Sequence, residues 1–235
     1  MIDIHCHILP GMDSDGPRDQ AEALEMGTIA AADGIRLIVA TPHANADLPS
    51  RERIGKEVAE LNAAFKAAGL PIEVVRGAEV GINLSVDILK NYTINDSGYV
   101  LLEFPHTHFP QTAREKVFMA LVAGLRPIVA HAERNGSVLR NPSMLRELVA
   151  AGALVQVTAG SLTGAFGEEV MDCARYLLKK ELVHFLASDA HSAGRRNPVI
   201  SAGAEVAAKL VGAAAARRLV EANPRLVLSG ENLDP

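Results

Sequence analysis

The chain places histidines and carboxylates at spacings that suit a metal site. His5 and His7 lie two residues apart at the end of an apolar run, so an extended backbone would direct both imidazoles to the same side. Asp189 and His191 show the same spacing near the other end of the chain. Single candidates follow further apolar runs, and these are His43, Glu79, Glu103 and His131.

Such a concentration of ionisable groups would be strongly unfavourable without counter-charge. Divalent cations would keep the histidines neutral and the carboxylates ionised, so we expect a metal centre where these residues meet. Nitrogen and oxygen ligands with no cysteine among them fit Mn, Zn or Fe.

Alternating strands and helices must bring these residues together. Apolar, β-branched runs that suit buried parallel strands occupy residues 1–4, 35–40, 72–75, 99–102, 127–130, 153–157 and 182–187. Helix-like segments lie at 19–32, 52–68, 112–123, 142–151 and 168–180, with a last one at about 202–222. Because the candidate ligands directly follow the strand runs, we predict one parallel α/β barrel over residues 1–235 rather than an open sheet.

Composition narrows the class of protein. A chain of 235 residues falls within the range of single α/β barrels, and 49% hydrophobic residues suit a large core. The net charge of -5 argues against nucleic acid as a partner. No run reaches the roughly 18 apolar residues of a membrane span. Cys6 and Cys173 show no disulfide spacing, so we expect buried, inert thiols and a cytoplasmic location, while the oligomeric state stays open.

The order of these motifs resembles the polymerase and histidinol phosphatase (PHP) superfamily. Within it, the chain is most similar to the bacterial manganese-dependent protein tyrosine phosphatases of capsular and exopolysaccharide synthesis. The motifs that carry the resemblance are His5-Cys6-His7-Ile8-Leu9-Pro10 with Asp15-Gly16, Thr41-Pro42-His43, Gly77-Ala78-Glu79, Glu103-Phe104-Pro105, Ala130-His131-Ala132-Glu133-Arg134-Asn135 and Ala187-Ser188-Asp189-Ala190-His191.

The resemblance implies a distorted (β/α)7 barrel with three divalent metal ions, expected to be Mn, with Fe or Zn as alternatives. The implied ligands are His5, His7, Asp15, His43, Glu79, Glu103, His131, Asp189 and His191. Glu79 would bridge two ions. Glu103 is also expected to take part in catalysis, and Arg134 and Arg196 to hold the substrate phosphate.

The implied reaction is hydrolysis of phosphotyrosine on the tail of a bacterial tyrosine autokinase. Water on divalent metals loses a proton near neutral pH, and the resulting hydroxide would attack phosphorus in line. Planar guanidinium groups suit the phosphate anion that the arginines would neutralise. The alternatives are a PHP-type phosphatase of a metabolite such as histidinol phosphate, an amidohydrolase-like enzyme that cleaves a C–N bond, and a barrel without activity that serves as a binding module.

Some positions stay open between alternatives. The first loop reads Asp13-Ser14-Asp15-Gly16, so Asp13 competes with Asp15 as ligand, and Arg195 competes with Arg196 for the phosphate. No general acid is assigned, although His108 is a candidate. His106 and His108 have the same two-residue spacing as the predicted ligand pairs, but they follow the end of the strand run. Further loop residues that suit contact with water, substrate or a phenyl ring are Thr158, Ser161, Thr163, Phe104, Phe109 and Phe166.

Overall fold

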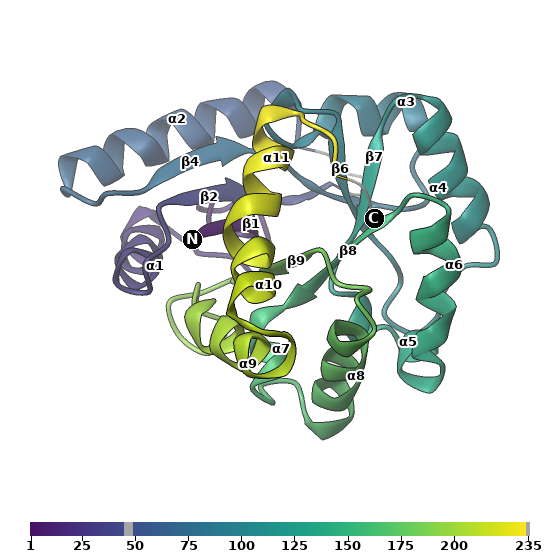
Figure 1. Cartoon of the computed structure of the whole chain (residues 1–235). Coiled ribbons are helices and arrows are strands. Elements are labelled where there is room, and N and C mark those ends of the chain that lie inside the picture. The colour runs from purple at the N-terminus through teal and green to yellow at the C-terminus, as the bar shows by residue number, and fades with distance from the viewer. Residues whose placement is uncertain (45–48, 234–235) are drawn as a thin grey trace.

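Short parallel strands form the centre of the molecule in the computed structural model, which describes residues 1–44 and 49–233 (Figure 1). The strands are β1 (Ile2–Cys6), β2 (Leu37–Ala40), β3 (His43–Ala44), β4 (Glu73–Arg76), β5 (Glu79–Gly81), β6 (Tyr99–Glu103), β7 (Arg126–Val129), β8 (Leu154–Thr158) and β9 (Phe185–Ala187). They pair in the orders β1-β2-β4 and β3-β5-β6-β7-β8-β9, always in parallel.

The two sheets continue into one another. Between β2–β4 and β3–β5, the Gly77 amide donates to the Ala40 oxygen at 2.9 Å and the Glu79 amide donates to the Pro42 oxygen at 3.1 Å. At the other edge, a parallel bridge pairs Cys6 with Ala190, just after β9. The sheet is therefore curled, with its first strand beside its last.

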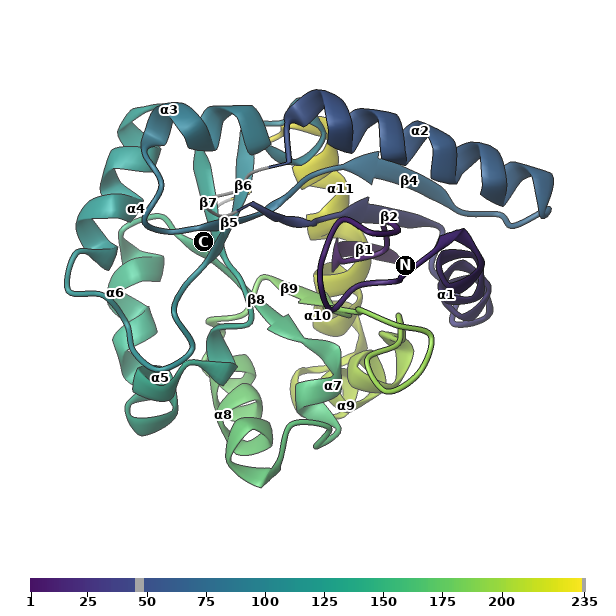
Figure 2. The same ribbon diagram turned by 180° about the vertical axis from the view of Figure 1, so that it is seen from behind.

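Helices lie outside the strands, as Figures 1 and 2 show from opposite sides. The α-helices are α1 (Gln20–Ala32), α2 (Arg51–Ala67), α3 (Val86–Leu89), α4 (Ala113–Val122), α5 (Gly136–Arg140), α6 (Leu145–Ala150), α7 (Ala159–Leu162), α8 (Glu168–Lys179), α9 (Ser201–Val211), α10 (Ala213–Arg217) and α11 (Asn223–Ser229). Short 3₁₀ turns are η1 (Lys90–Tyr92), η2 (Ile94–Asp96), η3 (Ala132–Arg134) and η4 (Pro142–Met144), and η5 (Arg218–Ala222) is a π-helical segment. Side-chain caps start α1 at Asp19 and α2 at Ser50.

Alternate strand residues divide between two apolar clusters. Tyr99 and Leu101 of β6 pack in a cluster made mostly of strand residues, and this cluster fills the space that the strands enclose. Val100 and Leu102 pack instead with helix residues such as Val117 of α4. The predicted parallel α/β architecture is confirmed.

Three differences from the predicted elements have physical causes. The short strands β3 and β5 were missed because each follows a break in a longer apolar run. The predicted helix at 202–222 is wrong as a single element: Gly212 adopts φ +90, which ends α9 and starts a new helix. The last strand starts only at Phe185: just before it, the Val155 amide donates to the ring of His184, while the His184 amide donates to the Val155 oxygen.

Two further observations bear on the expected setting of the protein. Cys6 and Cys173 are free and buried. No helix within the described residues has both the length and the apolar character needed to cross a membrane.

Candidate active site

A shift in strand register turns the first two histidines into the enclosed space. Asp3 pairs with Ile38 and Cys6 with Ala40, so β1 carries one more residue than β2 between these pairs. An extra residue reverses which side chains face inward. As a result, Ile4 packs among the enclosed strand residues, yet His5 and His7 are also buried there, at the carboxyl end of the strands.

Glu79 of β5 is the centre of the cluster. Its Oε1 atom lies 2.7 Å from His131 Nε2, and the side chain is buried. Its Oε2 atom approaches three further imidazole nitrogens, at 3.4 Å from His5 Nε2, 3.3 Å from His7 Nε2 and 3.2 Å from His43 Nδ1. One carboxylate therefore lies against four histidines, two from the end of β1, one from β3 and one that follows β7.

Side chains from the strand ends form overlapping sets whose ligand atoms lie within 4.8 Å of one another. The sets are His7-His43-His191, His5-Glu79-His131, His5-His7-Asp189 and His43-Glu79-Glu103. Every predicted ligand except Asp15 occurs in at least one set. Residues far apart in the chain are thus brought to one place.

The hydrogen bonds around the cluster fit bound cations. The amide oxygen of Gln156 accepts from the His131 amide at 2.9 Å, so it must also accept from His5 Nδ1 at 3.0 Å. Asp13 Oδ2 accepts from His7 Nδ1 at 3.0 Å. When both rings are neutral, with the proton on Nδ1, the lone pairs of His5 Nε2 and His7 Nε2 face each other at 3.2 Å. A positive ion between them would remove this repulsion, and such outer hydrogen bonds are typical of metal-binding histidines.

Electrostatics point in the same direction. Burial disfavours a charged His5, but the negative charges of Glu79 and Asp189 outweigh it and raise the pKa of His5 to about 9. The same balance, with Glu79 as the main anion, raises the pKa of His43 to about 9. Burial also opposes ionisation of Glu79, yet the neighbouring His5 and His131 hold its pKa well below the ordinary value. The cluster therefore attracts positive charge.

Both predicted phosphate-binding arginines reach one edge of the cluster. Arg134 Nη1 and Arg196 Nη2 pair with the same oxygen of Asp189, Oδ2, the second at 2.9 Å. The Arg134 guanidinium also lies over the ring of Phe166, 4.6 Å from its centroid. Arg195 is exposed and forms no ion pair within residues 1–44 and 49–233. Of the two adjacent arginines, Arg196 is the one directed toward the cluster.

The two aspartates of the first loop have different surroundings. The Asp13 side chain is buried; it accepts from the His43 amide at 2.8 Å through Oδ1 and from His7 Nδ1 at 3.0 Å through Oδ2. Asp15 is half exposed, with Oδ2 3.4 Å from His191 Nε2 and 3.6 Å from Arg196 Nη1. Figure 2 shows the purple segment after β1 beside the light green segment after β9. Asp13 therefore supports two predicted ligands, His7 and His43, whereas Asp15 faces the predicted ligand His191 from the edge of the cluster.

Other loop residues divide between the cluster and its surroundings. The His106 ring stacks on His131, with centroids 5.3 Å apart, whereas His108 is exposed and pairs with Thr107. Ser161 donates to Glu133 Oε1 at 2.6 Å. Thr163 donates to the Gly160 oxygen at 3.0 Å. Both hydroxyls thus have partners within the protein.

The aromatic candidates also separate. Phe104 and Phe109 stack on each other, with centroids 4.4 Å apart, and only Phe166 contacts a predicted site residue through its ring. Sequence reasoning missed Gln156, although a polar residue inside the apolar run 153–157 was a usable signal.

A protein-family model described as capsular polysaccharide synthesis, CpsB/CapC, matches residues 1–229. The chain belongs to the CpsB/CapC family. The resemblance seen in the sequence is thereby confirmed. Tyrosine-protein phosphatase YwqE of Bacillus subtilis is 40% identical over 203 residues, covering 84% of this chain and 80% of YwqE. Tyrosine-protein phosphatase CpsB of Streptococcus pneumoniae is 31% identical over 242 residues, covering 97% of this chain and 98% of CpsB.

Solved structures extend the comparison for this CpsB/CapC family member. A crystal structure described for YwqE of B. subtilis and CpsB of S. pneumoniae, as metal-dependent tyrosine phosphatases, matches with a TM-score of 0.94 and 37% identity. It covers 99% of this chain and 96% of that chain. Histidinol phosphate phosphatase of Lactococcus lactis matches with a TM-score of 0.51 and 16% identity over 94% of this chain and 93% of that chain, which supports a shared fold alone.

Proposed function

We propose that the protein is a metal-dependent protein tyrosine phosphatase. The observation that carries the proposal is the edge where Arg134 and Arg196 meet Asp189 beside the histidine–carboxylate cluster. Cations that generate a nucleophile and arginines that neutralise phosphate are the two components that phosphate ester hydrolysis needs. The named relatives that share this family are tyrosine phosphatases, which favours this function over histidinol phosphate hydrolysis.

Three divalent cations, most suitably Mn with Fe or Zn as alternatives, are proposed to occupy the cluster. When bound, they would lower the pKa of water so that hydroxide is available at neutral pH. The proposed ligands are His5, His7, Asp15, His43, Glu79, Glu103, His131, Asp189 and His191. Glu79 suits a bridging role because both its oxygens face imidazoles. Asp15 would complete the set of His7, His43 and His191 from the rim.

The chain's own residues would orient and stabilise the phosphate. Arg134 and Arg196 are proposed to turn part of their hydrogen-bonding capacity from Asp189 to the phosphate oxygens, where planar donors give paired contacts. Glu103 is proposed to act beside the reacting atoms. Burial and the negative charge of Glu79 raise the pKa of Glu103, which suits a group that exchanges protons.

The remaining parts of the proposal concern substrate, place and fold. We propose phosphotyrosine on the tail of a bacterial tyrosine kinase as the substrate and the cytoplasm as the location. We also propose that the sheet is best counted as a distorted (β/α)7 barrel in one domain over residues 1–235, with β2–β3 and β4–β5 each taken as one interrupted strand.

A turnover panel tests the proposed function. The purified protein, with its metal content determined by elemental analysis, would be assayed on a phosphotyrosine peptide, the matched phosphoserine peptide and histidinol phosphate. We expect the phosphotyrosine peptide to be hydrolysed fastest and chelation to stop the reaction. Equal or better rates on histidinol phosphate would assign the enzyme to the metabolite class, and no metal-dependent turnover of any ester would favour the binding module.

A further inference from the structure

A cavity of about 160 Å³ adjoins the cluster on the side of β8 and β9. One wall runs from Thr158 to Phe166 and includes α7, and the other is the segment from Ser188 to Val199 after β9. The first turn of α9 closes the back. Figure 2 shows α7 next to α9, with the light green segment after β9 beside them. None of the histidines of the cluster lines this cavity.

The cavity begins where the phosphate is proposed to bind. Asp189 and Arg196 line it, and both belong to the edge that the two arginines form. Phe166 lines it as well, and the guanidinium of Arg134 lies 4.6 Å from the centre of its ring. A phosphate ester held by the arginines therefore has the opening of this cavity beside it.

Small residues give the cavity its shape. Ala159, Gly160 and Ala165 leave room next to the flat ring of Phe166. The back wall lies close because Gly203 has no side chain: a Cβ there would be 2.6 Å from the Ala159 oxygen. Such a narrow space with an aromatic wall suits a planar ring better than a branched group.

Two polar donors in the lining have no partner among the described residues. The Thr158 hydroxyl is buried, with the residue 1% exposed, and its Oγ1 makes no hydrogen bond. Arg196 Nε is likewise buried and unpaired. Buried donors of this kind are costly unless a ligand or water supplies an acceptor. An oxygen-bearing end of an aromatic ligand would supply one.

We propose that this cavity receives the aromatic ring of phosphotyrosine and that Phe166 is a specificity-determining residue. The inference rests on the proposed function and explains why the enzyme would prefer phosphotyrosine to phosphoserine. The phosphate oxygens lie on the arginines, the ring lies against Phe166, and the Thr158 hydroxyl faces the oxygen that joins them. The short side chain of phosphoserine would leave the cavity without apolar contact.

Binding of two phosphonates separates the ring from the phosphate group. Phenylphosphonate and methylphosphonate would be titrated by calorimetry into the metal-loaded protein. Burial of a ring predicts that phenylphosphonate binds the wild type about tenfold tighter or better. Phe166→Ala removes the wall, and Ala202→Leu fills the cavity from an exposed, helical lining position. Both variants should reduce the ratio to about twofold or less.

Controls distinguish the ring site from a general loss of binding. Phe109→Ala removes a loop aromatic outside this cavity and should keep the full ratio. Ala202→Leu should leave the affinity for methylphosphonate unchanged, whereas Phe166→Ala should also weaken it because Arg134 loses its support. Phe166→Tyr should restore both values.

Two results would overturn the ring site: equal affinity of the wild type for both phosphonates, or a full ratio in both cavity variants. The proposed function is read separately from turnover of the phosphotyrosine peptide. An enzyme that hydrolyses the peptide but shows no preference for phenylphosphonate rejects this inference alone, and absence of peptide turnover rejects the proposed function and this inference with it.

Discussion

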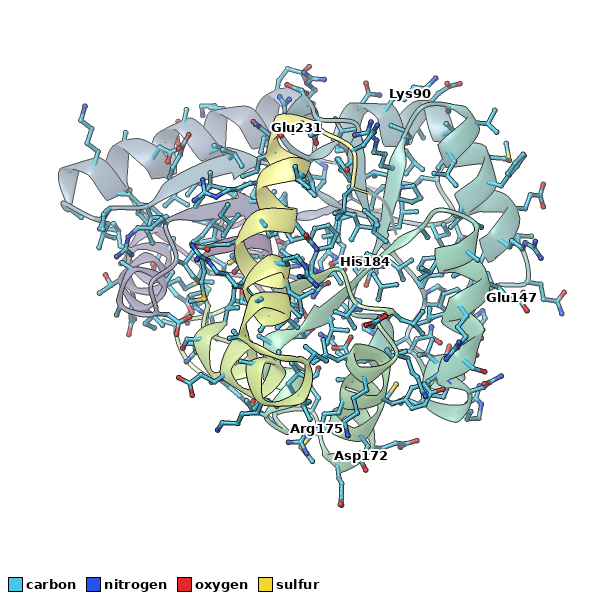
Figure 3. All side chains as sticks on the ribbon, viewed as in Figure 1. Lys90, Glu147, Asp172, Arg175, His184 and Glu231 are labelled. Carbon is cyan, nitrogen blue, oxygen red and sulfur yellow. The ribbon has the colours of Figure 1, made fainter. Side chains whose placement is uncertain are left out.

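Buried ionisable groups occur in two regions of this protein, and the two regions differ in how these groups are hydrogen-bonded. Outside the predicted ligands, Asp3 and His184 each have partners of their own. Asp3 accepts from the Ser188 amide at 3.0 Å and from the Ser188 hydroxyl at 2.5 Å. His184, labelled in Figure 3, accepts from the Val155 amide at 3.0 Å and lies beside the C-terminal helices, where Asn223 donates to its backbone oxygen.

In the cluster, hydrogen bonds from other parts of the protein reach one nitrogen of the His5 and His7 rings but not the other. Asp13 and Gln156 bind the Nδ1 atoms of His7 and His5, but the Nε2 atoms face each other and Glu79. When the two rings are neutral, no other side chain within the described residues donates to either Nε2 atom. Burial alone therefore does not mark a functional site, whereas buried groups oriented toward one another without a protein partner do.

The largest effect is expected from ligands of the cluster. Glu79→Gln, Asp189→Ala and His191→Ala should each lower kcat by about 10³-fold or more, because loss of a ligand should exceed the about 10–100-fold effects of supporting residues. The fold should persist by circular dichroism. His184→Asn is the matched control, a buried polar residue of the other region, and should keep turnover. Equal losses in both regions would break the comparison.

Arg134→Ala should raise KM for the phosphotyrosine peptide by about 10–100-fold, the cost of losing a charged hydrogen bond. Arg196→Ala should act in the same direction, since both guanidinium groups reach Asp189. Arg195→Ala should have the smallest effect because its side chain is exposed. Steady-state kinetics of the three variants measure these effects. Unchanged kinetics in Arg134→Ala would show that Arg134 does not hold the phosphate.

Substitutions of the two loop aspartates should distinguish a residue that holds a ligand in place from a residue that binds the metal itself. Asp13→Asn should weaken metal affinity by about 10–100-fold without changing the number of ions bound at saturation, because the amide no longer fixes the His7 ring. Asp15→Asn should reduce the number of ions bound per chain if it completes the set with His191. Elemental analysis after dialysis measures the number of metal ions bound per chain. The reverse pattern would exchange the two roles.

Cation binding should release protons. His5 and His43 have pKa values raised to about 9 in the metal-free cluster, so at pH 7 both carry protons that a cation must displace. Apparent affinity should rise by about tenfold per released proton for each pH unit up to about pH 9. Calorimetry in buffers of different ionisation enthalpy counts the protons. A pH-independent affinity between pH 7 and 9 would contradict the charge balance described above.

The smallest effect is expected from His184, and it concerns stability alone. Burial lowers the pKa of His184 to about 4. The unfolded chain, with a pKa of about 6.5, takes up a proton first, so the stability that the neutral ring contributes is present above pH 6.5 and is lost as the pH falls toward 4. Up to about 3 kcal/mol is at stake. In His184→Asn, the free energy of unfolding in urea should depend less on pH between pH 4 and 6.5. An unchanged dependence would show that other groups cause it.

Much of this protein was predictable because its signals are local. Each strand run was found within a few residues of its observed position, and the predicted ligands lie at or shortly after the ends of these runs. The missed short strands β3 and β5 have a common cause: after Pro42 and Gly77, pairing resumes only through neighbours that the sequence does not identify. The helix break at Gly212 was readable in principle, since glycine is common where helices end.

The amino-acid sequence by itself determined which residue types lie near the strand ends and that paired histidines share one side of a strand, because a strand alternates its side chains with a period of two. Only the tertiary structure decided which atoms remain free. Gln156 orients His5 across 151 positions of the chain, and Phe166 meets Arg134 through a loop that no periodicity describes. Hydrogen bonds and cavities of this kind depend on how distant segments pack, and packing distances are not encoded in local pattern.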